Sequence, residues 1–236
     1  MNIIRFVKRR KVLKNVYNFL RSILKKDSSE FKSNKKFLLE ANTVLNKISD
    51  ILDENRIDYW IDFGTLLGII RDSEIIKWDK DIDIGVRDQN NSVKVKSVLE
   101  SNGFKLIRDI RLKSNGMGLE QTYVYNDVSV DIFYYHEEEG YIISYVYSSF
   151  DNSTFDNCIK KYGGLLPIKQ YLPNMETKAH SYKGFSIRIP EHPEEYLRFH
   201  YGEDYLTPKI WDYKDTKNDN VSSENVTDDL GVLSKY

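Results

Sequence analysis

The sequence has little cysteine and no long hydrophobic run. Cys158 is the one cysteine among 236 residues, so an intrachain disulfide is excluded and a reducing compartment is compatible. No apolar run reaches the roughly 18 residues that a membrane-spanning helix needs. Charges interrupt the first hydrophobic stretches, which argues against a secretory signal. We therefore expect a cytoplasmic protein.

Two further classes are disfavoured by what is missing. The four histidines have no paired spacing and no cysteine nearby, which argues against a zinc site. The net charge is −1, so no global field directs the chain toward nucleic acid, and we expect no nucleic-acid partner. Hydrophobic residues make up 40% of the chain and charged residues 30%, a balance typical of a soluble globular domain.

The N-terminal segment is strongly basic. Residues 1–26 contain lysine and arginine but no acidic residue, and Leu13, Val16, Tyr17 and Leu20 recur at helical spacing. One interpretation is a peripheral membrane anchor, in which apolar burial and attraction to anionic lipid at the inner face of the membrane act together. The other interpretation is a helix packed on the domain with its basic face in solvent.

Hydrophobic periodicity predicts alternating helices and strands. Residues 27–34 are polar and typical of a linker, and the chain from about Asp212 is polar and typical of a loose tail. The expected helices cover residues 37–54, a short stretch after Gly64, 93–99 and 193–201. The expected strands cover residues 59–61, 81–86, 121–125, 128–134 and 141–147, with a tight hairpin at Asn126-Asp127.

Paired carboxylates mark the candidate metal site. Asp81 and Asp83 alternate along a predicted strand, so both project from the same face. Two adjacent carboxylates repel each other, and a hard divalent cation is the usual compensating partner. Asp131 lies within an apolar strand, and its face could meet that of Asp81 and Asp83 across the sheet. The alternative is that the pair lines the solvent side of an edge strand.

A candidate anion site precedes these carboxylates. A strand leads into Gly64-Thr65 and a helix start, which directs backbone N–H groups toward an anion. Gly64 permits close approach, and Thr65 adds a hydroxyl. Arg71 follows within two helical turns and could clamp a phosphate through two N–H groups. Metal, helix N-terminus and arginine together are typical of a nucleotide diphosphate site.

The same residues resemble a known family signature. Trp60-Ile61-Asp62-Phe63-Gly64-Thr65-Leu66-Leu67-Gly68, then Arg71, then Trp78-Asp79-Lys80-Asp81-Ile82-Asp83-Ile84 resembles the LicD/fukutin pattern almost residue for residue. A second stretch, Ile189-Pro190 with Pro193 to Leu197 and Tyr201-Gly202, resembles the family's closing element. The resemblance implies an α/β (α+β) fold of nucleotidyltransferase type, with a mixed sheet flanked by helices. It divides the chain into an extension (1–30), a catalytic domain (31–211) and a tail (212–236).

The resemblance also implies an activity. LicD/fukutin members transfer a phosphorylated alcohol such as phosphocholine or ribitol phosphate from a CDP-linked donor to a glycan. Asp81, Asp83 and Asp131 would then bind Mg²⁺ or Mn²⁺, and Gly64, Thr65 and Arg71 would bind the donor. The acceptor would be a cell-surface glycan, free or lipid-linked. A nucleotidyltransferase that moves NMP, and a non-catalytic envelope-assembly protein on the same fold, remain as alternatives.

For each of three residues the sequence leaves two interpretations of its role open. Asp62 ends a predicted strand, where it could deprotonate the acceptor hydroxyl or cap the following helix. Asp79 suits either a supporting acid or a turn residue. Arg71 could bind the donor, or it could pair with Asp72 or Glu74 as a structural arginine.

Overall fold

The structure is a computed structural model that describes residues 28–208 and 222–236. The basic segment 1–26, with both of its interpretations, lies outside the described residues. No helix in the described ranges is long and apolar enough to cross a membrane. The helix predicted for 37–54 starts earlier: α2 spans Ser28–Glu54 and takes in the polar stretch for which we expected a linker. That expectation is wrong, because polar residues with few helix breakers can extend the first turns of an amphipathic helix.

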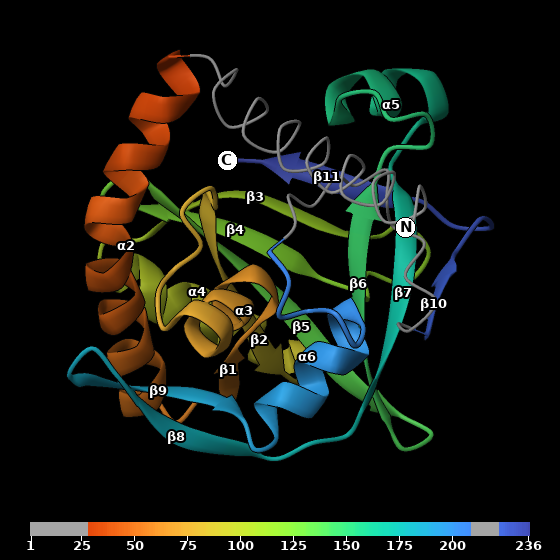
Figure 1. Ribbon diagram of the computed structural model, residues 1–236. Coiled ribbons are helices and arrows are strands. Elements are labelled where there is room, and N and C mark those ends of the chain that lie inside the picture. The colour runs from red at the N-terminus through yellow and green to blue at the C-terminus, as the bar shows by residue number, and fades with distance from the viewer. Residues whose placement is uncertain (1–27, 209–221) are drawn as a thin grey trace, which may run out of the picture.

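One curled sheet organises the domain (Figure 1). Within the described residues it has nine strands, in the order β10-β7-β6-β5-β4-β3-β11, with β2 joined to β5 and β1 joined to β2. The strands are β1 (Tyr59–Ile61), β2 (Asp81–Arg87), β3 (Lys105–Leu112), β4 (Glu120–Tyr125), β5 (Val128–Glu138), β6 (Tyr141–Ser148), β7 (Leu166–Pro173), β10 (Ser222–Asn225) and β11 (Gly231–Lys235). A separate hairpin consists of β8 (Thr177–Tyr182) and β9 (Phe185–Pro190). The mixed α/β architecture confirms the predicted fold class.

Helices cover the sheet. They are α2, α3 (Phe63–Asp72), the short 3-10 helix η1 (Gln89–Asn91), α4 (Ser92–Ser101), α5 (Phe155–Tyr162) and α6 (Pro193–Tyr201). α2 packs against β5 and α4 against β3, whereas α3 lies over β2 and contacts α6 (Figure 1). Ile82 and Ile84 point away from α3 into the core and are fully buried, as the alternation along the strand predicts.

β2 is an interior strand, so the edge-strand alternative is wrong. It pairs antiparallel with β1 and parallel with β5. The tight hairpin before β5 is confirmed: Asn126 and Asp127 both have positive φ, at 51° and 63°, as a two-residue turn requires. This turn places β4 beside β5 and so builds the other side of the site.

The C-terminal segment is not a loose tail. β10 pairs with β7 and β11 pairs with β3, so the expectation is wrong for residues 222–235. Pairing satisfies edge backbone groups at both ends of the sheet, which does not require an apolar sequence. Gly231 also packs so closely against Tyr147 that a Cβ there would lie 2.4 Å from its ring. Composition does not reveal this local fit.

Candidate functional site

Three carboxylates gather at the start of β2. One oxygen from each of Asp79, Asp81 and Asp83 lies within 4.8 Å of the others, and Asp83 is 8% exposed. Asp79 precedes the strand, and its backbone N–H donates to Ile76 in the connecting loop. The sequence predicted Asp81 and Asp83 on one face and left Asp79 between two roles; the structure brings Asp79 into the group. A set of hard oxygen donors at this spacing could hold a metal ion.

The start of α3 lies directly against these carboxylates. A Cβ on Gly64 would lie 2.9 Å from Asp79 Oδ2 and 3.5 Å from Asp83 Oδ2, so a side chain there would fill the space beside the acids. Thr65 joins the two elements: the Asp83 backbone N–H donates to Thr65 Oγ1 at 2.9 Å, and the Thr65 N–H donates to Asp83 Oδ2 at 3.4 Å. The predicted Gly-Thr turn therefore faces the carboxylate cluster.

Asp131 lies beside Asp83 on the neighbouring strand, as predicted. The β2–β5 register places the two residues opposite each other, so their side chains share a face of the sheet. The Asp131 carboxylate accepts a hydrogen bond from the Thr122 hydroxyl and lies 3.5 Å from Arg108 Nη2. Among the described residues, the group within 4.8 Å contains Asp79 rather than Asp131. Asp131 is thus adjacent to the cluster and held by its own partners.

Sequence reasoning missed two charged residues on this face. Arg108 of β3 donates through Nε to Thr122 at 2.7 Å and lies 3.3 Å from Glu120 of β4. The Glu120 carboxylate is buried, and Arg108 links it to Asp131. A signal was present, because the two-residue Asn126-Asp127 turn fixes the register of β4 and places Thr122 opposite Asp131. Nothing comparable in the sequence fixes where β3 lies.

Asp62 occupies the N-cap of α3. Its carboxylate accepts from the Phe63 N–H at 2.8 Å, from the Tyr135 hydroxyl at 2.7 Å and from the Tyr196 hydroxyl at 2.7 Å. The residue is fully buried. This is the capping arrangement, one of the two roles that the sequence left open.

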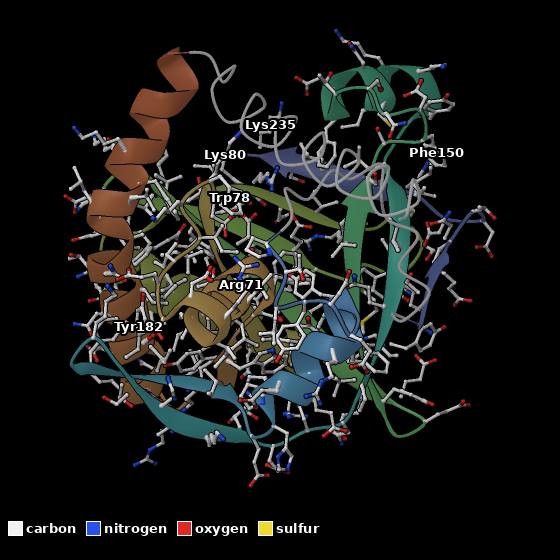
Figure 2. The ribbon with its side chains drawn as sticks, viewed as in Figure 1. Arg71, Trp78, Lys80, Phe150, Tyr182 and Lys235 are labelled. Atoms are coloured by element: carbon white, nitrogen blue, oxygen red, sulfur yellow. The ribbon has the colours of Figure 1, made fainter. Side chains whose placement is uncertain are left out.

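Arg71 lies at the last turn of α3 (Figure 2). Its side chain is only 5% exposed. Its Nε and Nη2 donate to Asp72 at 3.0 Å and 2.6 Å, which is one of the pairings considered as a structural alternative. α3 ends at Asp72 because Ser73 adopts the left-handed conformation, with φ 55°. The short helix that a phosphate-binding Arg71 requires is therefore present, and its guanidinium already has one carboxylate partner.

Burial and mutual repulsion make the acids on this face reluctant to ionise. Burial raises the pKa of Asp81 to about 6, with Asp79 adding to the effect, and burial likewise raises the pKa of Asp79 to about 6. Burial, followed by the charges of Asp81 and Asp79, raises the pKa of Asp83 well above its usual value. Burial raises the pKa of Asp131 to about 6 and, with Asp131 nearby, that of Glu120 to about 8. A cation would relieve this cost.

The raised pKa values predict how stability depends on pH in the presence of a chelator. Around neutral pH the folded chain holds a proton on Glu120 that an unfolded chain, with an ordinary carboxyl pKa near 4, has lost. The free energy of unfolding should therefore fall by about 1 kcal/mol or more between pH 7 and pH 9. The opposing effect of buried His200, whose pKa burial lowers to about 3, is confined below about pH 6.5.

Urea unfolding at several pH values checks this expectation, and Glu120→Gln is the matched variant. It removes this protonated acid, so its stability should depend less steeply on pH. A wild-type stability that stays level or rises from pH 7 to pH 9 would contradict the proposed electrostatics of this face.

The fold and the site together define a class. An interior strand with alternating aspartates, a neighbouring strand with a third, and a Gly-Thr helix start against them form a nucleotidyltransferase-type domain. Residues 56–171 match the family described as LicD/FKTN/FKRP, nucleotidyltransferase domain. Residues 56–171 therefore form a LicD-family domain.

Two related proteins align with more than half of this chain. Human ribitol-5-phosphate transferase FKTN is 24% identical over 184 residues, which cover 78% of this chain and 35% of that protein. An uncharacterized protein of Rickettsia typhi is 28% identical over 141 residues, 60% of this chain and 41% of its own length. The chain thus spans between about a third and two fifths of these relatives.

A crystal structure of ANT(2")-Ia in complex with adenylyl-2"-tobramycin aligns with a TM-score of 0.42 at 15% identity. The alignment covers 73% of this chain and 82% of that one. A likeness of this strength carries no conclusion about function.

Proposed function

We propose that this protein moves a phosphorylated alcohol from a CDP-linked donor to a hydroxyl of a cell-surface glycan, with the help of Mg²⁺ or Mn²⁺. The observation that carries the proposal is the carboxylate group of Asp79, Asp81 and Asp83 set against the Gly64-Thr65 turn, within a LicD-family domain. The human relative is named a ribitol-5-phosphate transferase, which favours ribitol phosphate as the transferred group over glycerol phosphate or phosphocholine.

The residues fit a divalent cation. The donor set is all carboxylate, burial and the repulsion between its members raise the pKa of Asp81 and Asp83, and a side chain at Gly64 would fill the space beside it. We propose that Asp79, Asp81 and Asp83 hold the ion, with Asp131 facing it from β5. A bound cation would neutralise phosphate oxygens and stabilise the charge that develops on the leaving group.

The other residues then have defined tasks. The Gly64 N–H at the N-terminus of α3 would bind a phosphate oxygen, because the Phe63 and Thr65 N–H groups already donate to Asp62 and Asp83. Arg71 would bind a second phosphate oxygen. The acceptor oxygen attacks the phosphorus that bears the transferred alcohol, and CMP leaves with the electron pair of the broken P–O bond. Asp131, which lies opposite Asp83 on β5, would accept the hydroxyl proton.

Location follows from the proposed acceptor. A glycan that is still linked to lipid would bring the enzyme to the inner face of the membrane, and the basic residues 1–26 would support a peripheral contact there. The reaction itself would take place in the cytoplasm.

A thermal-shift screen tests the proposal. CDP-ribitol, CDP-glycerol and CDP-choline are each added with Mg²⁺ or Mn²⁺, and an effective ligand should raise the Tm by about 2 °C or more, since it binds the folded state alone. CMP release in the presence of a glycan acceptor then measures transfer. If no CDP-alcohol raises the Tm with either cation, the proposed donor class is wrong.

Arg71→Lys tests the donor site separately. The guanidinium has five N–H donors, and Asp72 uses two of them, which leaves three for a phosphate. Lysine retains the charge but not the planar fork, so we expect turnover to fall about 10-fold or more while the affinity for Mn²⁺ hardly changes.

Asp72→Asn is the matched control for Arg71→Lys. It weakens the ion pair but keeps the guanidinium, so turnover should persist. If Arg71→Lys keeps its rate within about two-fold and lowers only the Tm, Arg71 is a structural partner of Asp72 instead.

A further inference from the structure

A buried polar network lies directly behind the turn that faces the carboxylates. Asp62 accepts hydrogen bonds from Tyr135 of β5 and Tyr196 of α6, each at 2.7 Å. Tyr196 in turn accepts from Trp60 Nε1 at 3.2 Å. Asp62, Trp60 and Tyr135 are fully buried, and Tyr196 is 5% exposed. Three separate elements, β1, β5 and α6, thus converge on one carboxylate.

The Asp62 carboxylate stabilises a strained backbone conformation at Phe63. Phe63 has a φ of 38°, a left-handed conformation that costs free energy for a residue with a side chain. Its N–H donates to Asp62 Oδ1 at 2.8 Å, and the Asp62 N–H donates to the Asp83 carbonyl at 3.0 Å. Phe63 leads directly into Gly64 and Thr65. Asp62 therefore determines where the turn lies relative to β2.

The connection continues to the carboxylate cluster. Thr65 exchanges hydrogen bonds with Asp83 through its hydroxyl and its backbone N–H. A shift of the turn would move Thr65 away from Asp83 and would open the close approach between Gly64 and Asp79. The two tyrosine hydroxyls are thus linked to the cluster by a continuous chain of short contacts.

The network argues against the other interpretation of Asp62, that of a base which deprotonates the acceptor hydroxyl. A base must reach the acceptor hydroxyl, whereas this carboxylate is sealed from solvent and both of its oxygens already accept hydrogen bonds. Burying a carboxylate is costly unless hydrogen bonds compensate, and the two phenols supply that compensation.

We propose that Tyr135 and Tyr196 are positioning residues for the site, which act through Asp62 to hold the Phe63-Gly64-Thr65 turn against Asp83. Tyr196 lies outside residues 56–171, so the functional unit extends beyond the matched domain to include α6. The part of the inference that concerns the cation rests on the proposed function.

The experiment uses the full chain with Tyr135→Phe, Tyr196→Phe and the control Tyr134→Phe. Tyr134 is the neighbour of Tyr135 on β5, is 1% exposed, and donates a hydrogen bond of the same 2.7 Å length to Gln121 on the other face of the sheet. Each variant loses one buried hydroxyl, so losses of Tm should be similar. Amide hydrogen exchange of residues 62–68 without metal, and Mn²⁺ titration, are measured for all three.

We expect the two test variants to exchange the amides of residues 62–68 about 10-fold faster than wild type, and to bind Mn²⁺ about 10-fold more weakly, a loss typical of a hydrogen bond to a charged group. Tyr134→Phe should change neither. Unchanged exchange in both test variants overturns the positioning role. Faster exchange with wild-type Mn²⁺ affinity overturns the link between the two tyrosines and the cation site. If wild type binds no Mn²⁺, the proposed function loses its cation, while the exchange measurement still decides the role of the tyrosines.

Discussion

Asp83→Asn is expected to abolish turnover and to make the metal-free protein more stable. Asp83 is the most central carboxylate of the site: it belongs to the Asp79-Asp81-Asp83 group, contacts Thr65, and lies opposite Asp131. Loss of a charged ligand from a group that binds a cation removes several kcal/mol of transition-state stabilisation, which corresponds to a rate loss on the order of a thousand-fold or more.

Stability is expected to rise although turnover is lost, because the buried Asp83 carboxylate destabilises the folded chain when no cation is bound. Burial and the charges of Asp81, Asp79 and Asp131 raise the pKa of Asp83. A neutral amide removes that repulsion and can still accept the Thr65 N–H. The Tm in the presence of a chelator should therefore rise, and added Mg²⁺ should no longer raise it further.

Asp109→Asn is the matched control. Asp109 is also a buried aspartate on a strand, 2% exposed, but it lies in β3 on the other face of the sheet from Arg108. Arg111 compensates its charge at 2.7 Å, and the Tyr236 hydroxyl donates to it at 2.8 Å. Its replacement should keep turnover and lower the Tm. If Asp83→Asn retains Mg²⁺-dependent turnover, or if both variants lose stability alike, the assignment of the cation site is wrong.

The sequence could predict the features of the fold and the site that depend on local periodicity. Alternation places Asp81 and Asp83 on one face of β2, and the two-residue turn at Asn126-Asp127 fixes the β4–β5 register. The strand containing Asp131 was recognisable because an acid stands among apolar residues. The structure confirms each of these placements.

What it could not predict depends on contacts between distant elements. Arg108 has the pattern of an ordinary alternating charge until β3 is placed beside β4. Tyr196 reads as a core residue of an amphipathic helix, because only tertiary packing brings its hydroxyl to Asp62. β11 is five residues long with only two large apolar residues, Val232 and Leu233, so its sequence alone is too short to predict its place beside β3, where it pairs with the edge of the sheet.

The largest expected effect on stability comes from Gly85→Ala, in the middle of β2. Gly85 lies opposite Trp60 in the β1–β2 pair, and a Cβ there would lie 2.3 Å from Trp60 Cε2 and 2.7 Å from its Nε1. These are rigid ring atoms, and the indole is fully buried. It also packs on Tyr135 with ring centroids 4.7 Å apart and donates to Tyr196, so it has no free space into which to move.

We expect Gly85→Ala to lower the free energy of unfolding by about 3 kcal/mol, the upper end of the usual cost of overpacking, and the Tm by roughly 6–12 °C. The measurement is chemical and thermal unfolding of wild type, Gly85→Ala, Trp60→Phe and the double variant. Phenylalanine lacks the ring atoms that the new methyl group would strike. The loss of unfolding free energy in the double variant should therefore be smaller than the sum of the two single losses by about 1 kcal/mol or more. Strictly additive losses would show that the methyl group does not meet Trp60. That outcome would contradict the close packing of β1 on β2.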